Sequence, residues 1–315
     1  MTPTLRPLTF GETLDRIWWI LRQRPRLFAA IGIVPVAVLL LSVAAMFGIL
    51  YALGDFPQPQ TAQAPARVVM AMFVAMGTMM IPMMAAFAIF HAAACHAALA
   101  VNRGLEVTWD GAYRAALGQA GRYVWLMLLC WLAVSAPELL VLALLGTLGV
   151  VLGGQGSPGL WLAMIPLLVM GYLGAVVYMV WMMLRLVLSF PAAAAENIAA
   201  TQAMRRSFLL TRKAKGRIFL IMLVVYAITY AGIMAMELAI LAVAGVSGLI
   251  GVALHLHPGQ ALSIAGITVG GMAGAAVFLV VMALIYASYA ISVSVLYEDQ
   301  VIRIDGPPAL TGGAV

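Results

Sequence analysis

Long apolar segments separated by short polar ones run through this sequence from end to end. A transmembrane helix needs about 20 mostly apolar residues to cross a hydrocarbon core about 30 Å thick. Segments of that length occur at residues 27–53, 68–101, 123–152, 160–190, 218–254 and 262–297. The pattern therefore predicts an all-α polytopic membrane protein with six transmembrane helices.

Some of the polar segments also have helical periodicity. Apolar residues recur every three to four positions, with Arg residues on the other side, in residues 9–23, after Thr108, and in residues 198–211. Thr9 and Glu12 have the spacing of a capping box. A helix with one apolar and one cationic face lies in the plane of the membrane interface. We therefore expect three interfacial amphipathic helices.

Positive charge is concentrated in alternate connections. Nearly all of the 17 Lys and Arg residues precede the first span, lie between the second and third, or lie between the fourth and fifth. The only Lys or Arg in the other three connections is Arg67. Because Lys and Arg in short loops favour the cytoplasmic side, both termini and the amphipathic helices are expected in the cytoplasm.

An amphipathic helix followed by two spans occurs three times, in residues 9–101, 108–190 and 198–297, and leaves residues 298–315 as a cytoplasmic tail. All three units enter the membrane from the same side, so the pattern favours a parallel three-fold repeat over the inverted repeat of many transporters. The remaining connections are too short for a soluble domain. We expect residues 1–315 to form a single membrane domain.

Composition excludes a water-soluble fold, since 65% of the residues are hydrophobic, 9% are charged and the mean hydropathy is +1.08. Typical soluble domains have about 25% charged residues. Cys95 and Cys130 lie in apolar segments, which favours buried thiols over a disulfide. Phosphate-binding loops, zinc-binding helix motifs and nucleophile elbows are absent from the sequence. We expect no enzymatic activity, no metal or other cofactor, and no nucleic-acid binding.

Three ionisable residues within the apolar segments are candidates for an intramembrane polar site: Glu138, Glu237 and Arg185. A charged residue at the centre of a membrane helix costs about 2.5–3.5 kcal/mol, so such residues usually face the bundle interior or water. Glu138 and Glu237 either line a cavity for a cation or protons, or are solvated near the outer interface. The long side chain of Arg185 either extends to the cytoplasmic interface or contacts a lipid phosphate or an acidic partner.

Two further groups of residues are candidates for contacts. The cations Arg205, Arg206, Arg212, Lys213, Lys215 and Arg217 determine topology and are candidate contacts for anionic lipid or a protein partner. Gly266, Gly270 and Gly274 have four-residue spacing, which makes a flat surface for helix packing. Their packing partner is either another helix of the chain or a second copy in a homo-oligomer.

Four segments match the pattern of one family: Leu8 to Arg16, Arg185 to Pro191 leading to Glu196 and Asn197, Ala203 to Arg212, and Leu296 to Asp299 with Arg303 and Gly306. In these segments the chain resembles the glycerophosphoryl diester phosphodiesterase membrane domain family of bacteria and archaea. It departs from the family pattern at Ala192–Ala195 and at Gln300-Val301. The resemblance covers almost the whole chain and implies a stand-alone bacterial membrane domain, without the phosphodiesterase barrel and without an assigned activity.

These features predict a non-enzymatic protein of the bacterial inner membrane that organises lipid or a protein partner at the cytoplasmic face. The alternative is a transporter or channel for a small solute or lipid that uses Glu138 and Glu237.

Overall fold

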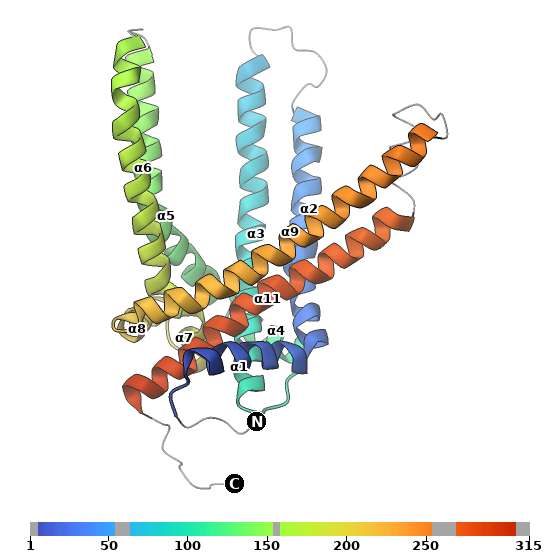
Figure 1. Ribbon diagram of the computed structural model, residues 1–315. Helices are drawn as coiled ribbons and strands as arrows, with labels where there is room; N and C mark the ends of the chain where they lie inside the picture. Colours follow the sequence, from blue (N-terminus) through green and yellow to red (C-terminus); the bar gives the residue numbers. More distant parts are fainter. Residues whose placement is uncertain (1–5, 54–63, 154–157, 254–268, 307–315) are drawn as a thin grey trace.

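The fold is helical throughout the residues that the computed structural model describes, which are 6–53, 64–153, 158–253 and 269–306. Six helices are long and apolar enough to cross a membrane. They are α2 (Pro25–Leu53), α3 (Ala64–Asn102), α5 (Ala120–Gly153), α6 (Pro158–Leu186), α9 (Lys215–Ala253) and α11 (Val269–Asp305). The predicted all-α polytopic fold is confirmed (Figure 1).

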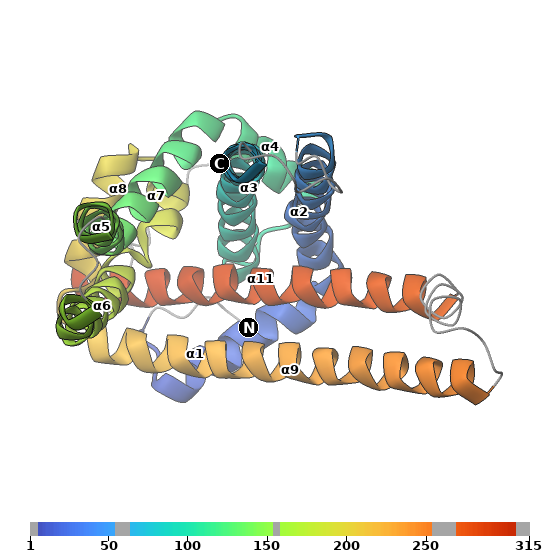
Figure 2. The same cartoon turned by 90° about the horizontal axis from the view of Figure 1, so that it is seen from above.

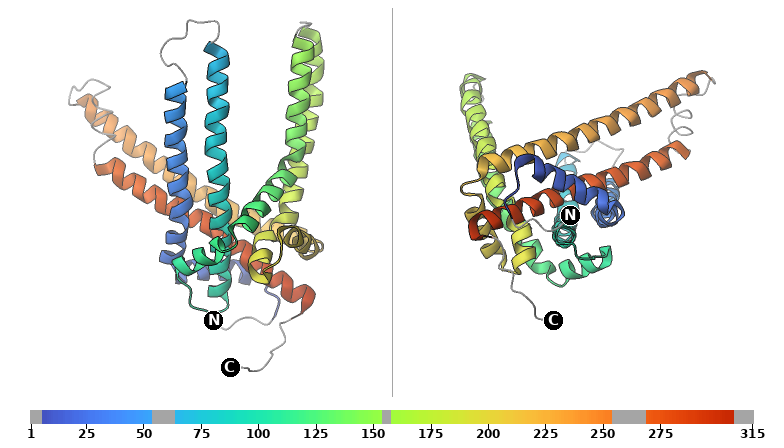
Figure 3. Two further views of the ribbon diagram at one scale, coloured as in Figure 1. Left: turned by 180° about the vertical axis from the view of Figure 1, so that it is seen from behind. Right: turned by 60° about the horizontal axis from the view of Figure 1, so that its bottom comes forward.

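Short helices gather at one end of the molecule: α1 (Phe10–Gln23), α4 (Trp109–Leu117), α7 (Ser189–Glu196) and α8 (Ala200–Thr211). The adjoining ends of the six long helices lie there too, and we call this the basal end (Figure 1). From it the pairs α2/α3, α5/α6 and α9/α11 extend in diverging directions (Figure 3). One short helix precedes each of the first two pairs, α1 before α2/α3 and α4 before α5/α6, whereas two short helices, α7 and α8, precede α9/α11. The predicted three-fold repeat of these units stays a prediction.

Side-chain caps define where the first short helices begin. The Thr9 hydroxyl accepts a hydrogen bond from the Glu12 N–H at 3.3 Å, and the Glu12 carboxylate accepts one from the Thr9 N–H at 2.7 Å. The predicted capping box is therefore present. Thr108 caps α4 in the same way by accepting from the Gly111 N–H at 3.1 Å. Each such cap contributes about 1 kcal/mol to helix stability.

Helix α11 is the central element. Within an apolar stretch of 18 residues in α11, 56% of the residues are buried, whereas 6% are buried in the corresponding stretch of α5. It packs against α2, α3, α9 and α1, as the view from above shows (Figure 2). Small residues are fully buried on these helices, among them Ala283, Ala287 and Ala290 of α11 and Ala92–Ala94 of α3. Small side chains let helix backbones approach each other in a membrane.

The predicted glycine packing surface is in the outer part of the last membrane segment. Gly266 lies outside the described residues, and the surroundings of Gly270 and Gly274 lie outside the described side chains.

Beyond their basal ends the long helices expose large apolar side chains. Leu140 of α5 and Val177 of α6 are both 70% exposed, and Ile228 of α9 is 66% exposed. Apolar surface on this scale marks contact with a membrane.

Two boundaries differ from those expected from hydropathy. The apolar segment at 160–190 ends as a helix at Leu186, and the chain then forms the separate helix α7, closed by Asn197 in the left-handed conformation with φ of 54°. Residues 298–305, expected as part of a tail, continue α11 to Asp305. The reason is that their charged side chains form ion pairs at the basal end, which hydropathy does not register.

Candidate functional site at the basal end

Charged groups are concentrated at the basal end. Among the described side chains, Glu138 is the only one with a charge that lies away from it. The basal charges lie on the short helices and on the adjoining turns of the long ones. Where these charges are buried, pairing stabilises them, because an unpaired charge away from water is unfavourable by several kcal/mol.

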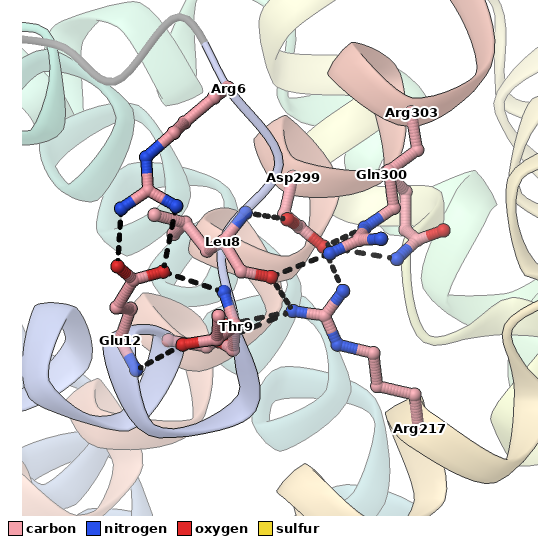
Figure 4. Close-up of polar contacts among 9 residues, drawn as sticks. Arg6, Leu8, Thr9, Glu12, Arg217, Asp299, Gln300 and Arg303 are labelled. Atoms are coloured by element: carbon pink, nitrogen blue, oxygen red, sulfur yellow. Dashed lines mark hydrogen bonds and ion pairs between the residues drawn. The ribbon is translucent and has the colours of Figure 1, made fainter.

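The first group, the Asp299 cluster, joins α9 and α11 to the segment that leads into α1 (Figure 4). The Asp299 side chain is fully buried, and one carboxylate oxygen accepts from the Leu8 N–H at 2.8 Å. The other oxygen faces Arg217 at 3.0 Å and Arg303 at 2.9 Å. Both guanidinium groups also donate to the Leu8 carbonyl, at 2.6 and 2.5 Å. One buried carboxylate therefore fixes both ends of the described chain.

The second group, the Glu298 cluster, joins α1 to the ends of α3 and α11. Arg16 is 5% exposed and donates to the Asn102 side-chain oxygen at 2.6 Å and to its carbonyl at 2.9 Å. Glu298 accepts from the Asn102 amide and from Arg103, the latter at 2.7 Å. Burial lowers the pKa of Arg16 from its ordinary value, and the charge of Glu298 opposes that shift.

The third group, the Glu196 cluster, joins α7, α8 and α11. Glu196 accepts from the Tyr297 hydroxyl at 2.6 Å and from Arg206 at 2.8 Å. Arg206 also pairs with Asp305. The hydrogen bond to Asp305, together with that to Glu196, raises the pKa of Arg206 above its ordinary value. Arg206 is therefore committed to contacts within the chain.

Asn197 connects the end of α7 to the start of α5. Its side-chain oxygen accepts from Gln119 and from Arg122, both at 2.8 Å. Arg122 also donates to the Ala193 carbonyl at 3.2 Å and to the Tyr123 hydroxyl at 2.9 Å. Asn is one of the few residues other than Gly that readily adopts a positive φ, which explains its position at this turn.

The six cations predicted as lipid or partner contacts divide into two groups. Arg206 and Arg217 bind carboxylates inside the chain, as described above. Arg205, Arg212 and Lys213 are exposed, and Lys215 is half-buried. Within the described part of the chain, none of these four forms an ion pair.

Arg185 lies near the basal end of α6, where its guanidinium carbon is 4.7 Å from the ring centre of Trp181 and 4.8 Å from that of Phe208. The Lys215 ammonium is 5.4 Å from the same Trp181 ring. We call these four residues the Arg185 patch. A cation over an aromatic face is stabilised electrostatically.

The other two candidates for the intramembrane polar site lie elsewhere. Glu138 is exposed on α5, and the side chain of Glu237 lies outside those described. Val141, nearly one turn beyond Glu138, packs beside Gly171 of α6. At 1.5 Å per helical residue, Arg185 is then about 16 Å along α6 from the level of Glu138. Arg185 and Glu138 are therefore not brought together.

The clusters contain residues that the sequence did not single out as a site. Asp299, Glu298, Asn102 and Arg16 have structural partners far along the chain. The available signal was the resemblance, because most of the cluster residues lie in the four segments that carry it.

Cys95 and Cys130 are free thiols; Cys95 is buried as predicted, and Cys130 is partly buried. In the described ranges, no three His, Cys, Asp or Glu side chains come together in a way that could hold a metal ion.

The fold and the outward apolar surface define a multi-pass membrane protein. Comparisons with protein families, with curated proteins and with solved structures find no match for this chain. The resemblance to the glycerophosphoryl diester phosphodiesterase membrane domain stays a prediction.

Proposed function

We propose that this protein is a non-enzymatic component of the bacterial inner membrane that organises anionic lipid or a protein partner at the cytoplasmic face. In this proposal the basal end faces the cytoplasm. The observation that carries it is the surface formed by Arg205, Arg212 and Lys213, which are exposed and have no ion pair within the described residues.

The balance of basal charge supports such a surface. The carboxylates of Glu196, Glu298, Asp299 and Asp305 are bound to arginines inside the chain, so they do not neutralise the exposed cations. The cytoplasmic leaflet has a negative surface potential, and each nearby Lys or Arg contributes about 1 kcal/mol of attraction to it. Leu209 of α8 is 59% exposed beside these cations and adds an apolar contact.

The basal network also supports a binding role over a catalytic one. A reaction centre needs a nucleophile, a base and an orienting group around a space for substrate. The carboxylates of the three clusters instead accept several hydrogen bonds from groups of the same chain. These groups hold helices together, and the surface around them presents the cations that have no ion pair within the described residues.

The test is to extract the protein with its surrounding membrane into polymer-bounded lipid particles and to identify the lipids and proteins that remain bound. Particles that contain the wild type are expected to be enriched in anionic lipid relative to the bulk membrane, or to retain a defined protein. The variant Arg205→Gln/Arg212→Gln/Lys213→Gln should lose that enrichment.

The matched control is Arg205→Lys/Arg212→Lys, which keeps the positive charge and should behave as the wild type. Absence of both lipid enrichment and a partner in the wild type would overturn the proposal. So would a triple Gln variant that retains everything the wild type binds.

A further inference from the structure

The Arg185 patch lies where α6 and α9 separate. The two helices contact each other close to the basal end, and α9 then runs away from α6 toward its distal end (Figures 1 and 2). Trp181 and Arg185 come from α6, Phe208 from α8, and Lys215 is the first residue of α9. Three helices therefore meet around two cations.

Neither cation has an anionic partner among the described residues. In the described part of the chain, no hydrogen bond or ion pair is formed by the side chain of Arg185 or of Lys215. The Nε of Arg185 is buried without an acceptor. Two like charges beside one Trp181 ring repel each other, and contact with aromatic faces compensates only part of that cost. The arrangement is incomplete without an anion.

The shape of the anion follows from the donors and from the surface next to them. A guanidinium binds phosphate oxygens in a bidentate manner, and an ammonium acts as a point charge. Beyond the patch the two helices expose apolar side chains, with Val177 70% exposed on α6, and Phe219 43% and Leu223 49% exposed on α9. Trp181, at 39% exposure, lies between Arg185 and Val177 along α6 and has both cations beside its ring. Such a surface accommodates acyl chains that are attached to the phosphate.

We propose that the Arg185 patch binds the headgroup phosphate of an anionic phospholipid, with the acyl chains along α6 and α9. This inference rests on the proposed function and names the class of lipid and the residues that select it. Charge complementarity favours a headgroup with net negative charge, because the patch offers two cations and, among the residues described, no carboxylate for the ammonium of a zwitterionic headgroup.

The experiment uses the full-length protein in nanodiscs of phosphatidylcholine, with and without phosphatidylglycerol, and measures retained lipid by native mass spectrometry. The wild type should retain phosphatidylglycerol in preference to phosphatidylcholine. The variant Arg185→Gln/Lys215→Gln should retain it at least tenfold less. Arg114→Gln provides a control for loss of a basal charge outside the patch, because Arg114 is exposed and pairs with Asp110, and it should retain lipid as the wild type does.

Two further measurements separate the explanations. Thermal unfolding in phosphatidylcholine alone should be the same for the wild type and the double variant, whereas phosphatidylglycerol should raise the Tm of the wild type only. Millimolar inorganic phosphate should leave the bound phospholipid in place, and displacement by it would overturn the inference in favour of a free phosphate site.

Equal retention of phosphatidylglycerol by the double variant and the wild type would also overturn the inference. The proposed function is judged independently, by the Arg205, Arg212 and Lys213 variant in native membranes. It stands if that variant loses its bound lipid or partner while the Arg185 patch proves dispensable.

Discussion

Gly32 of α2 lies against the backbone of Ala283 in α11. A Cβ at position 32 would be 2.5 Å from both the Cβ and the carbonyl oxygen of Ala283. Real Cβ atoms do not approach other atoms so closely, so only glycine fits at this crossing. The contact places α2 directly on the central helix.

Substitution of Gly32 by Ala should therefore destabilise the fold. Overpacking of this kind typically costs about 1–3 kcal/mol, and the neighbouring atoms are the backbone and Cβ of Ala283, which cannot rotate away. We expect a lower Tm in detergent and a broader size-exclusion profile. Gly48→Ala in the same helix is the matched control, because a Cβ there meets nothing within 4 Å and should leave the Tm unchanged or higher. Equal behaviour of the two variants would show that the crossing is looser than described.

Loss of the Asp299 carboxylate should release α1 from the basal end. Asp299→Asn leaves Arg217 and Arg303 without their shared anion and weakens the bond to the Leu8 N–H. Removing one partner of a buried charge cluster costs about 3–5 kcal/mol. Limited proteolysis in membranes should cut the region of residues 6–23 faster in the variant than in the wild type.

The control for that experiment is Asp110→Asn. Asp110 pairs with Arg114 on the exposed surface of α4, where an ion pair contributes about 0–1 kcal/mol. Its proteolysis pattern should match that of the wild type. An unchanged pattern in Asp299→Asn as well would mean that α1 is held by its apolar contacts alone.

Hydropathy predicted most of the fold because the bilayer imposes it. Long apolar segments must form helices in lipid, so the six helices and their approximate limits follow from the sequence. The capping residues Thr9 and Thr108 were equally readable, since a cap depends on neighbours within three positions. Hydropathy did not predict helix α7, because the turn after Leu186 depends on a residue outside it. The Ser207 hydroxyl accepts from the Leu188 N–H at 3.2 Å and donates to the Arg185 carbonyl at 2.6 Å.

The basal clusters were harder to predict for the same reason. Leu8 and Asp299 are 291 residues apart, and no local pattern indicates that they meet. Arg206 and Arg217 lie in the same basic segment as Arg205 and Arg212. Only the structure distinguishes the cations that have partners within the described chain from those that do not. Where an Arg lies is readable from the sequence; what it binds is set by the packing of the helices.

The start of α1 should become less stable in acid. The hydrogen bond from the Thr9 backbone, and then that from Arg6, lower the pKa of Glu12 from its ordinary value of 4.5. A lowered pKa means that the ionised group stabilises the folded state. This contribution is fully present above pH 4.5 and is lost as the pH falls through the lower pKa of the folded state. Compared with the Glu12→Gln variant at the same pH, hydrogen exchange in α1 of the wild type should accelerate as the pH falls through that range. A difference between the two proteins that stays constant with pH would contradict the assignment.

Replacement of Glu138 separates the proposed function from the transport alternative. Glu138 is exposed on α5 between apolar neighbours, and Leu139 and Leu140 beside it are 41% and 70% exposed. A charged side chain at the centre of a membrane helix costs about 2.5–3.5 kcal/mol, and less toward the interface. If the protein acts through its basal surface, Glu138→Leu should raise the Tm and leave the lipids and proteins that copurify unchanged. The Tm of Glu138→Gln should lie between those of the wild type and of Glu138→Leu. If Glu138 is part of a transport pathway, both variants should instead abolish a cation- or proton-dependent flux in liposomes that the wild type supports. Flux in the wild type that disappears in both variants, without a gain in Tm, would favour a transporter over the function proposed above.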